Sequence, residues 1–235
     1  MSPRTFFRRL RSRLTPTPAL PLGIRALDLE TARGAVVSFY MDNIAPEIIA
    51  AQRDVLERLV PPDIDILQVK TTLLHGDAMT RLMRRTRFRL IVFLDIDCIP
   101  VRAGAVDRLI ARAEGGHLAG AAQRANQIKG QKHVYAGPFC LALTAELYRD
   151  LGQPSFFETS RGDVGEELTW RAEEQGRTVD LLWPTACEVP CWNLTDKVTF
   201  GLGTTYDDDF WHAFEIRKPD GKARFLAKCD EVLAS

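Results

Sequence analysis

Short apolar runs alternate with amphipathic segments along the first half of the chain, and this alternation constrains the fold more than any other feature. The apolar runs at residues 35–40, 64–69 and 89–94 are separated by segments with helical periodicity at 46–60 and 77–87. An unbroken apolar run of this length is typical of a strand that is buried on both faces. Strands that alternate with helices predict an α/β fold with a largely parallel sheet.

The pattern is more mixed in the second half of the chain. We expect helices at 105–113, 144–151 and 166–175, and strands at 117–122, 134–143 and 178–183. The two glycines and two threonines within residues 200–206 predict either a flexible loop that closes over phosphates with its backbone N–H groups or a simple turn. The acidic run 207–209 is predicted to be solvated, because clustered carboxylates would repel a diphosphate.

Charge is unevenly distributed over the 235 residues. Residues 1–27 contain six arginines and no acid, which leaves an acidic remainder that argues against nucleic-acid binding. We predict a basic N-terminal segment with a Pro-rich linker over residues 1–26 and a single domain over residues 27–235. Residues 1–14 have near-helical apolar spacing between arginines, so they are either a membrane-surface helix or a basic tail.

The same composition leads us to expect a cytoplasmic protein, with peripheral contact at the inner face of an anionic membrane as an option for residues 1–14. The longest stretch without charge is shorter than the roughly 18 residues that a membrane span requires, and the arginine-rich start is unlike a signal peptide. The five cysteines include no CxxC pair and are read as reduced thiols.

The most specific chemical feature is a pair of carboxylates, Asp95 and Asp97, which directly follows the apolar run 89–94. In open α/β sheets, ligands bind beyond the carboxyl ends of the strands. Carboxylates at that edge, together with substrate phosphates, suit Mg²⁺ or Mn²⁺. A cation there would neutralise a diphosphate leaving group. The alternative is that both aspartates only cap a turn.

The segment IVFLDIDCIP at residues 91–100 resembles the DxD signature of GT-A glycosyltransferases, which use nucleotide sugars and have a Rossmann-like fold. Further segments agree in order, from the first strand and its end at residues 40–43 through 75–79, 162–167 and 200–206 to His212. The resemblance covers about residues 35–217. It implies a single GT-A domain with a mixed, mostly parallel sheet flanked by helices.

The metal ligands that we expect are Asp95, Asp97 and His212. The resemblance implies a third ligand near the end of the domain, often a histidine, and an imidazole suits a cation that a carboxylate and a diphosphate already hold. A hydrogen-bonded core histidine between Trp211 and Phe214 is the simpler alternative for His212. The residues predicted to contact the nucleotide sugar are Asp42, His75, Asp77, Asp95, Gly203 and Thr204.

The candidates for a catalytic base are Asp163, Glu166 and Glu167, at the start of the helix predicted near residue 166. Carboxylates at a helix N-terminus stabilise the helix dipole, so capping alone could explain them. The resemblance implies that inverting enzymes carry an acidic base here, which would take the proton of the acceptor hydroxyl. The sequence does not decide between the three, and a retaining enzyme would not need this base.

These features predict a metal-dependent glycosyltransferase that moves a sugar from a nucleoside-diphosphate sugar, with a UDP-sugar favoured, to a hydroxyl acceptor in bacterial surface glycan or glycoconjugate synthesis. A haloacid-dehalogenase-type phosphatase could also use Asp95, Asp97 and a later acidic motif, but its first motif normally opens the domain. A sugar-1-phosphate nucleotidyltransferase would need a Gly-rich loop with a lysine after Val37, and the chain has none there. A non-catalytic nucleotide-sugar-binding module is the remaining alternative.

Overall fold

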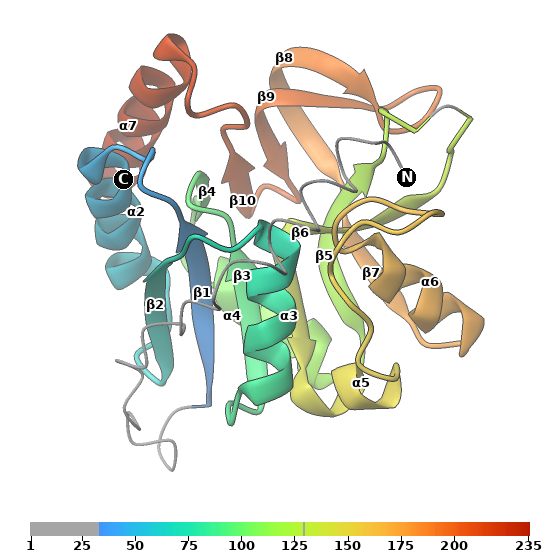
Figure 1. The fold of residues 1–235 in the computed structure, drawn as a ribbon. Coiled ribbons are helices and arrows are strands. Elements are labelled where there is room, and N and C mark those ends of the chain that lie inside the picture. The colour runs from blue at the N-terminus through green and yellow to red at the C-terminus, as the bar shows by residue number, and fades with distance from the viewer. Residues whose placement is uncertain (1–32, 129) are drawn as a thin grey trace.

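The computed structural model describes residues 33–128 and 130–235, which form two sheets with flanking helices (Figure 1). The predicted basic segment 1–26, and with it the possible membrane contact of residues 1–14, lies outside the described residues. Every strand and helix predicted between residues 35 and 183 is present, and the ends differ from the prediction by at most two residues.

The larger sheet has six strands in the order β2-β1-β3-β6-β5-β7. These strands are β1 (Gly34–Tyr40), β2 (Ile64–Lys70), β3 (Leu90–Leu94), β5 (Leu118–Arg124), β6 (Val134–Thr144) and β7 (Val179–Leu182). Strand β6 is antiparallel to both of its neighbours, β3 and β5, whereas all other pairs are parallel. Five strands therefore run in one direction, which confirms the predicted α/β class with a mixed, mostly parallel sheet.

Helices cover both faces of this sheet. They are α2 (Pro46–Leu59), α3 (His75–Arg85), α4 (Ala105–Glu114), α5 (Ala145–Asp150) and α6 (Glu166–Glu174). In β3, Ile91 and Phe93 pack on the side of α3, α5 and α6, while Val92 and Leu94 pack on the side of α4. Both faces are buried, so the strand is an unbroken apolar run rather than an alternating one.

The smaller sheet has four antiparallel strands in the order β4-β10-β9-β8. They are β4 (Cys98–Pro100), β8 (Pro184–Asn193), β9 (Thr199–Tyr206) and β10 (Phe210–His212). The predicted flexible loop at residues 200–206 is therefore wrong, because this segment is β9. Gly201 is needed there because the backbone of β8 passes so close that a Cβ atom would collide with Val189 and Cys191.

The acidic run at residues 207–209 is also not simply solvated. Asp207 and Asp208 both have positive φ angles, 49° and 55°, in the tight turn between β9 and β10. Asp is among the few residues other than Gly that tolerate this conformation. Asp209 is buried and accepts hydrogen bonds from Arg102 (2.5 Å) and Arg108 (2.8 Å), which fixes the turn against the segment that begins α4.

The last helix, α7 (Pro219–Ala234), lies beside α2 (Figure 1). Its buried residues Phe225, Cys229 and Val232 share an apolar cluster with Val55 of α2 and Trp211 of β10. None of the helices in the described part of the chain combines the length and apolar character that a bilayer crossing requires.

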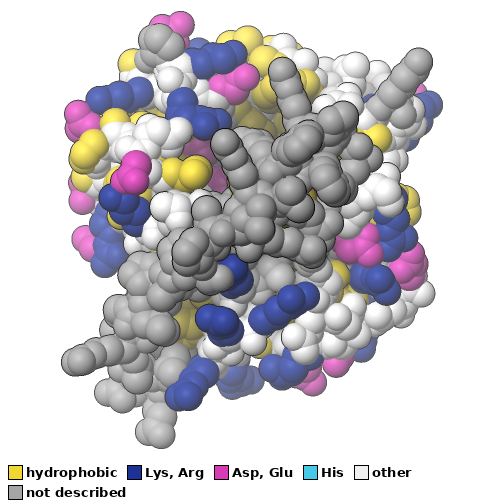
Figure 2. Space-filling model, in the orientation of Figure 1, with side chains coloured by type: hydrophobic (Ala, Val, Ile, Leu, Met, Phe, Trp, Pro, Cys, Tyr) yellow, Lys and Arg dark blue, Asp and Glu magenta, His cyan; other side chains and the backbone are white. Residues whose placement is uncertain are grey.

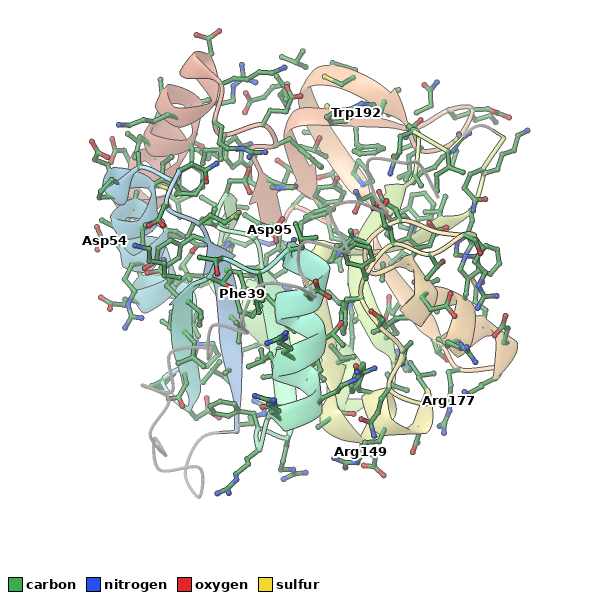
Figure 3. All side chains as sticks on the ribbon, in the orientation of Figure 1. Phe39, Asp54, Asp95, Arg149, Arg177 and Trp192 are labelled. Carbon is green, nitrogen blue, oxygen red and sulfur yellow. The ribbon has the colours of Figure 1, made fainter. Side chains whose placement is uncertain are left out.

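Residues 81–89 contain five arginines and no acid. Four of them are exposed: Arg84, Arg85, Arg87 and Arg89. Figure 2 shows Lys and Arg side chains gathered over the lower part of this face, in the region of α3. This basic surface lies toward the end of the large sheet opposite to the site described next (Figures 1 and 3).

Candidate metal and nucleotide site

Asp95 and Asp97 lie just beyond the carboxyl end of β3, in the turn that leads into β4. The amide of Asp95 donates to the carbonyl of Phe139 on β6 (2.8 Å), and the amide of Cys98 donates to the carbonyl of Asp95 (2.8 Å). From α2, the buried side chain of Gln52 donates to the carbonyls of Asp95 (2.7 Å) and Cys98 (3.0 Å). The turn is therefore fixed by the large sheet, the small sheet and a helix.

His212 reaches the same place from β10. It pairs with Cys98 of β4, and the amide of the next residue, Ala213, donates to the carbonyl of Asp97 (3.0 Å). The Nε2 atom of His212 lies 3.2 Å from Oδ1 of Asp97. One potential ligand atom from each of Asp95, Asp97 and His212 lies within 4.8 Å of the other two. The structure thus brings together the three residues predicted to be metal ligands.

The surroundings of this group suit a divalent cation. Burial raises the pKa of the Asp95 carboxyl, His75 opposes that rise, and the charge of Asp97 adds to it. The His212 ring is stacked on Phe139 with centroids 4.3 Å apart, and its buried Nδ1 atom has no hydrogen-bond partner among the described residues. Two close carboxylates and an imidazole form an O,O,N donor set that fits Mn²⁺ or Mg²⁺.

A cavity of about 240 Å³ opens beside the two aspartates. Its walls come from the end of β1, from the start of α3 and from residues 215–217 after β10. His75 begins α3 and places its Nε2 atom 3.2 Å from Oδ1 of Asp95, while its ring meets Phe39 edge-on with centroids 6.4 Å apart. Of the residues predicted to contact the nucleotide sugar, His75 and Asp95 therefore line the cavity.

The other residues of that predicted group lie elsewhere. Asp42 is exposed and paired with Lys70, and Asp77 is half-buried on α3; neither lines this cavity. Thr204 is fully buried in β9, where its hydroxyl accepts from the amide of Gly201 (2.8 Å) and donates to the carbonyl of Gly201 (2.7 Å). Gly203 faces the carboxylate of Glu188. Both residues belong to β9 within the small sheet and neither lines this cavity, so their contact with the nucleotide sugar stays a prediction.

The three acidic residues at the start of α6 have different surroundings. Glu166 is fully buried, accepts from the amide of Asp163 (2.8 Å) and lies 2.7 Å from Nδ1 of His133. Glu167 forms ion pairs with Arg161 (2.7 Å) and Arg171 (2.9 Å). The hydrogen bond from Arg161, with the further contribution of Arg171, lowers the pKa of Glu167 despite partial burial. A carboxylate stabilised in this way accepts a proton poorly.

Asp163 differs from both because its carboxylate is half-exposed. One oxygen accepts from the amide of Val164 (2.8 Å), and the other accepts from the side-chain amide of Gln127. The start of α6 approaches the metal group through β6, where Gly165 packs against Pro138 and the next residue, Phe139, stacks on His212. Among the three predicted bases, Asp163 therefore has the surroundings that best suit a proton acceptor.

Sequence reasoning missed two residues that hold this site together, Gln52 and Phe139. A signal for Gln52 is present, because it is a polar residue on the apolar face of α2, one turn after Ile48 and one turn before Leu56. No comparable signal marks Phe139, which is one of many apolar residues in β6.

No protein-family model and no curated protein matches the sequence. Solved structures with a similar arrangement include a Drosophila β-1,4-galactosyltransferase variant in complex with manganese, UDP-Gal and xylobiose, at 12% identity and a TM-score of 0.43 over 78% of this chain and 71% of that chain. A mannosyltransferase from Pyrobaculum calidifontis in complex with GDP-Man and Mn²⁺ has 14% identity and a TM-score of 0.48 over 76% of this chain and 61% of that chain.

A cytidylyltransferase from Thermus thermophilus that acts on 2-C-methyl-D-erythritol 4-phosphate is similar to the same degree. It has 12% identity and a TM-score of 0.45 over 83% of this chain and 98% of that chain. Likenesses at this level concern the arrangement of strands and helices, and they include both transferases and a nucleotidyltransferase.

Proposed function

We propose that this protein is a metal-dependent glycosyltransferase that transfers a sugar from a nucleoside-diphosphate sugar to a hydroxyl acceptor. The observation that carries the proposal is the convergence of Asp95, Asp97 and His212 beside a cavity at the carboxyl end of β3. This edge of an open α/β sheet is where ligands bind. We favour a UDP-sugar as donor and Mn²⁺ as the cation, because Mn²⁺ accepts an imidazole more readily than Mg²⁺ does.

Each residue of the site has a separate role in the proposed reaction. Asp97 and His212 hold the cation, and Asp95 shares it while remaining oriented by His75. A bound divalent cation would neutralise charge on the diphosphate leaving group. Arg217 lines the cavity and supplies positive charge for the phosphates, whereas Phe39 and His75 provide ring surface for the nucleotide. Asp163 accepts the proton of the acceptor hydroxyl.

The surroundings of Glu167 favour this proposal over a haloacid-dehalogenase-type phosphatase. Such an enzyme would need a later acid to join Asp95 and Asp97 at the metal. Glu167 instead pairs with Arg161 and Arg171. Within residues 33–128 and 130–235, the group of possible ligands is completed by His212 and includes no acid from the start of α6.

A thermal-shift screen followed by calorimetry tests the proposal. UDP, GDP and CMP are added with and without Mn²⁺, since a ligand that binds only the folded protein must raise the melting temperature. We expect one diphosphate to bind more tightly with Mn²⁺, and the matching nucleotide sugar to release that diphosphate slowly in water. Equal affinity with and without the metal would contradict the metal site. Binding without release from any nucleotide sugar, even with a broad acceptor panel, would indicate a binding module.

The same assays separate the remaining alternatives. Release of inorganic phosphate from phosphomonoesters would indicate a phosphatase. Release of pyrophosphate from CTP or UTP with a sugar phosphate would indicate a nucleotidyltransferase. Neither product is expected if the proposal is correct.

A further inference from the structure

A second cavity, of about 390 Å³, lies next to the metal group and separate from the nucleotide cavity. It is lined by Gln123, Arg124, Asn126, Gln127, Trp192, Phe200 and Phe214. Figure 3 labels Trp192 and Asp95, which lie toward the same end of the large sheet. The segment after β10 forms part of both cavities, because Phe214 lines this one and Glu215 lines the other.

Three aromatic rings form the apolar side of this second cavity. Trp192 lies 5.4 Å from both Phe200 and Phe214, measured between ring centroids, and the two phenylalanines are 5.8 Å apart. Trp192 is half-buried, so part of its ring remains accessible. A sugar ring presents C–H groups on its faces and hydroxyls around its edge, and an aromatic surface with a few polar groups nearby is suited to bind it.

The polar side consists of amide groups rather than carboxylates. The Oε1 atom of Gln123 is buried and has no hydrogen-bond donor among the described residues. Gln123 packs directly on the backbone of β6 at Gly137, where a Cβ atom would collide with it. A buried acceptor without a partner is unfavourable, and Gln123 lines the cavity, so a bound hydroxyl can donate to this oxygen once the side-chain amide turns toward it. Asn126 and Gln127 add exposed amides at the rim.

The cavity also contacts both parts of the proposed reaction machinery. The ring centroid of Phe214 lies 3.8 Å from that of the metal-ligand candidate His212. The side chain of Gln127 donates to the carboxylate of Asp163. Phe214 and Glu215 have left-handed backbone conformations, with φ angles of 52° and 46°. Non-glycine residues rarely adopt this conformation, so the backbone between the two cavities is unusual.

We propose that this second cavity binds the acceptor, and that the part of the acceptor bound there is a neutral sugar. The inference rests on the proposed glycosyltransferase function. The sugar ring would lie against Trp192 and Phe214 and donate a hydroxyl hydrogen to Gln123. The described residues that line the cavity include no carboxylate to attract a cation, and the one charged residue among them, Arg124, donates from Nε to the carbonyl of Gln131 (2.9 Å).

The transfer step follows from this placement. The acceptor hydroxyl oxygen forms a bond to the anomeric carbon of the donor sugar, while the bond from that carbon to the diphosphate oxygen breaks. The nucleoside diphosphate leaves with the bonding electron pair. The hydroxyl proton passes to the carboxylate of Asp163, so charge and atoms balance.

Saturation-transfer NMR with the whole chain, UDP and Mg²⁺ tests the proposal, because paramagnetic Mn²⁺ would broaden the signals of the bound glycoside. The probes are methyl β-glucoside, methyl β-galactoside and methyl α-mannoside, with glucuronate and a serine-containing peptide for comparison. We expect at least one neutral glycoside to bind, and Trp192→Ala and Gln123→Leu each to weaken it by about tenfold or more. The matched control is Trp183→Ala, because Trp183 is 40% exposed and lines neither cavity.

Metal-dependent UDP binding, measured by calorimetry on the same variants, distinguishes failure of the acceptor proposal from failure of the proposed glycosyltransferase function. It should be unchanged in Trp192→Ala and Gln123→Leu, and circular dichroism should show that both variants are folded. If UDP binds with Mn²⁺ but no neutral glycoside binds, or glycosides bind Trp192→Ala as well as the parent, the acceptor inference is wrong and the proposed function stands. Binding of only glucuronate or the peptide also overturns the inference. Loss of metal-dependent UDP binding in the parent would contradict the proposed function itself.

Discussion

The two sheets contribute to the site in different ways. The large sheet provides Asp95 and Asp97 at the end of β3, a strand buried on both faces. The small sheet provides His212 from β10 and the aromatic wall of the second cavity, while its outer strand β8 is largely exposed. Asp97 is where the sheets meet, because it contacts His212 and accepts the amide of Ala213. The large sheet thus positions the two carboxylates, and the small sheet adds the histidine of the candidate metal group.

Removing the carboxylate where the sheets meet should have the largest effect. In Asp97→Ala we expect kcat/KM to fall by about 10⁴-fold or more, because metal-assisted charge stabilisation of several kcal/mol would be lost. Calorimetry should show that Mn²⁺ no longer strengthens UDP binding. The matched control is Asp54→Asn, because Asp54 is exposed on α2 and lies apart from Asp95 in Figure 3. A metal effect that survives in Asp97→Ala would show that the two sheets do not share a cation.

The next effect concerns Asp163 before α6, which accepts a hydrogen bond from Gln127 of the second cavity. Asp163→Asn should lower kcat by roughly 10²–10⁴-fold, the usual contribution of a general base. Its UDP affinity should remain that of the parent. Glu167→Gln is the comparison variant. It removes the ion pairs with Arg161 and Arg171, so we expect a lower melting temperature and a kcat close to that of the parent. A greater kcat loss in Glu167→Gln than in Asp163→Asn would reverse the assignment of the base.

The contact between the small sheet and α4 should affect the free energy of unfolding and not the catalytic step. Asp209→Asn weakens the hydrogen bonds from Arg102 and Arg108 to a buried carboxylate, and we expect about 1–3 kcal/mol less unfolding free energy at pH 7. Urea denaturation of parent and variant measures this difference. Activity should follow the folded fraction, because Asp209 lines neither cavity.

The pH dependence of that difference has a defined sign. Burial acts to raise the pKa of Asp209, but hydrogen bonds from Arg108 and Arg102 outweigh it and keep the pKa below the usual value. The stabilisation is therefore fully present above the ordinary aspartate pKa of about 3.9 and is lost as the pH falls through the lower, folded-state value. The gap between parent and Asp209→Asn should shrink below about pH 4. A gap that widens in acid would contradict this account.

The contact between the large sheet and α4 should have the smallest effect on the free energy of unfolding. Arg33, just before β1, donates from Nε to Glu114 at the end of α4 (2.7 Å), and both side chains are more than one-third exposed. Exposed pairs contribute about 0–1 kcal/mol. In Glu114→Gln we expect a loss in that range that disappears in 1 M salt, measured by the same urea denaturation. A loss as large as that of Asp209→Asn would remove the distinction between the two contacts.

The sequence predicted the large sheet well for a physical reason. Strands such as β3 are covered by helices on both faces, so burial leaves an unbroken apolar run that can be read directly. Asp95, Asp97 and His212 could be proposed from ligand chemistry and a family resemblance. The stabilising role of Gln52 was harder to see, because its hydrogen-bond partners lie 43 and 46 residues away along the chain.

The small sheet was predicted poorly because its strands depend on contacts distant in sequence. Gly201 and Gly203 in β9 looked like loop glycines, yet Gly201 is required by the close passage of β8. Asp209 looked solvated within an acidic run, yet its arginine partners come from around the start of α4. Local composition describes neither situation, because in both the decisive neighbour belongs to another element.

The separation of the ligands along the chain has a consequence for biosynthesis. His212 follows Asp97 by 115 positions. A ribosome adds about 5–20 residues per second, so the carboxylates are made on the order of ten seconds before their histidine partner. A nascent chain that has not yet reached β10 contains the acidic pair without His212 and without Phe214. Such a chain therefore lacks the complete candidate metal group that the folded domain contains.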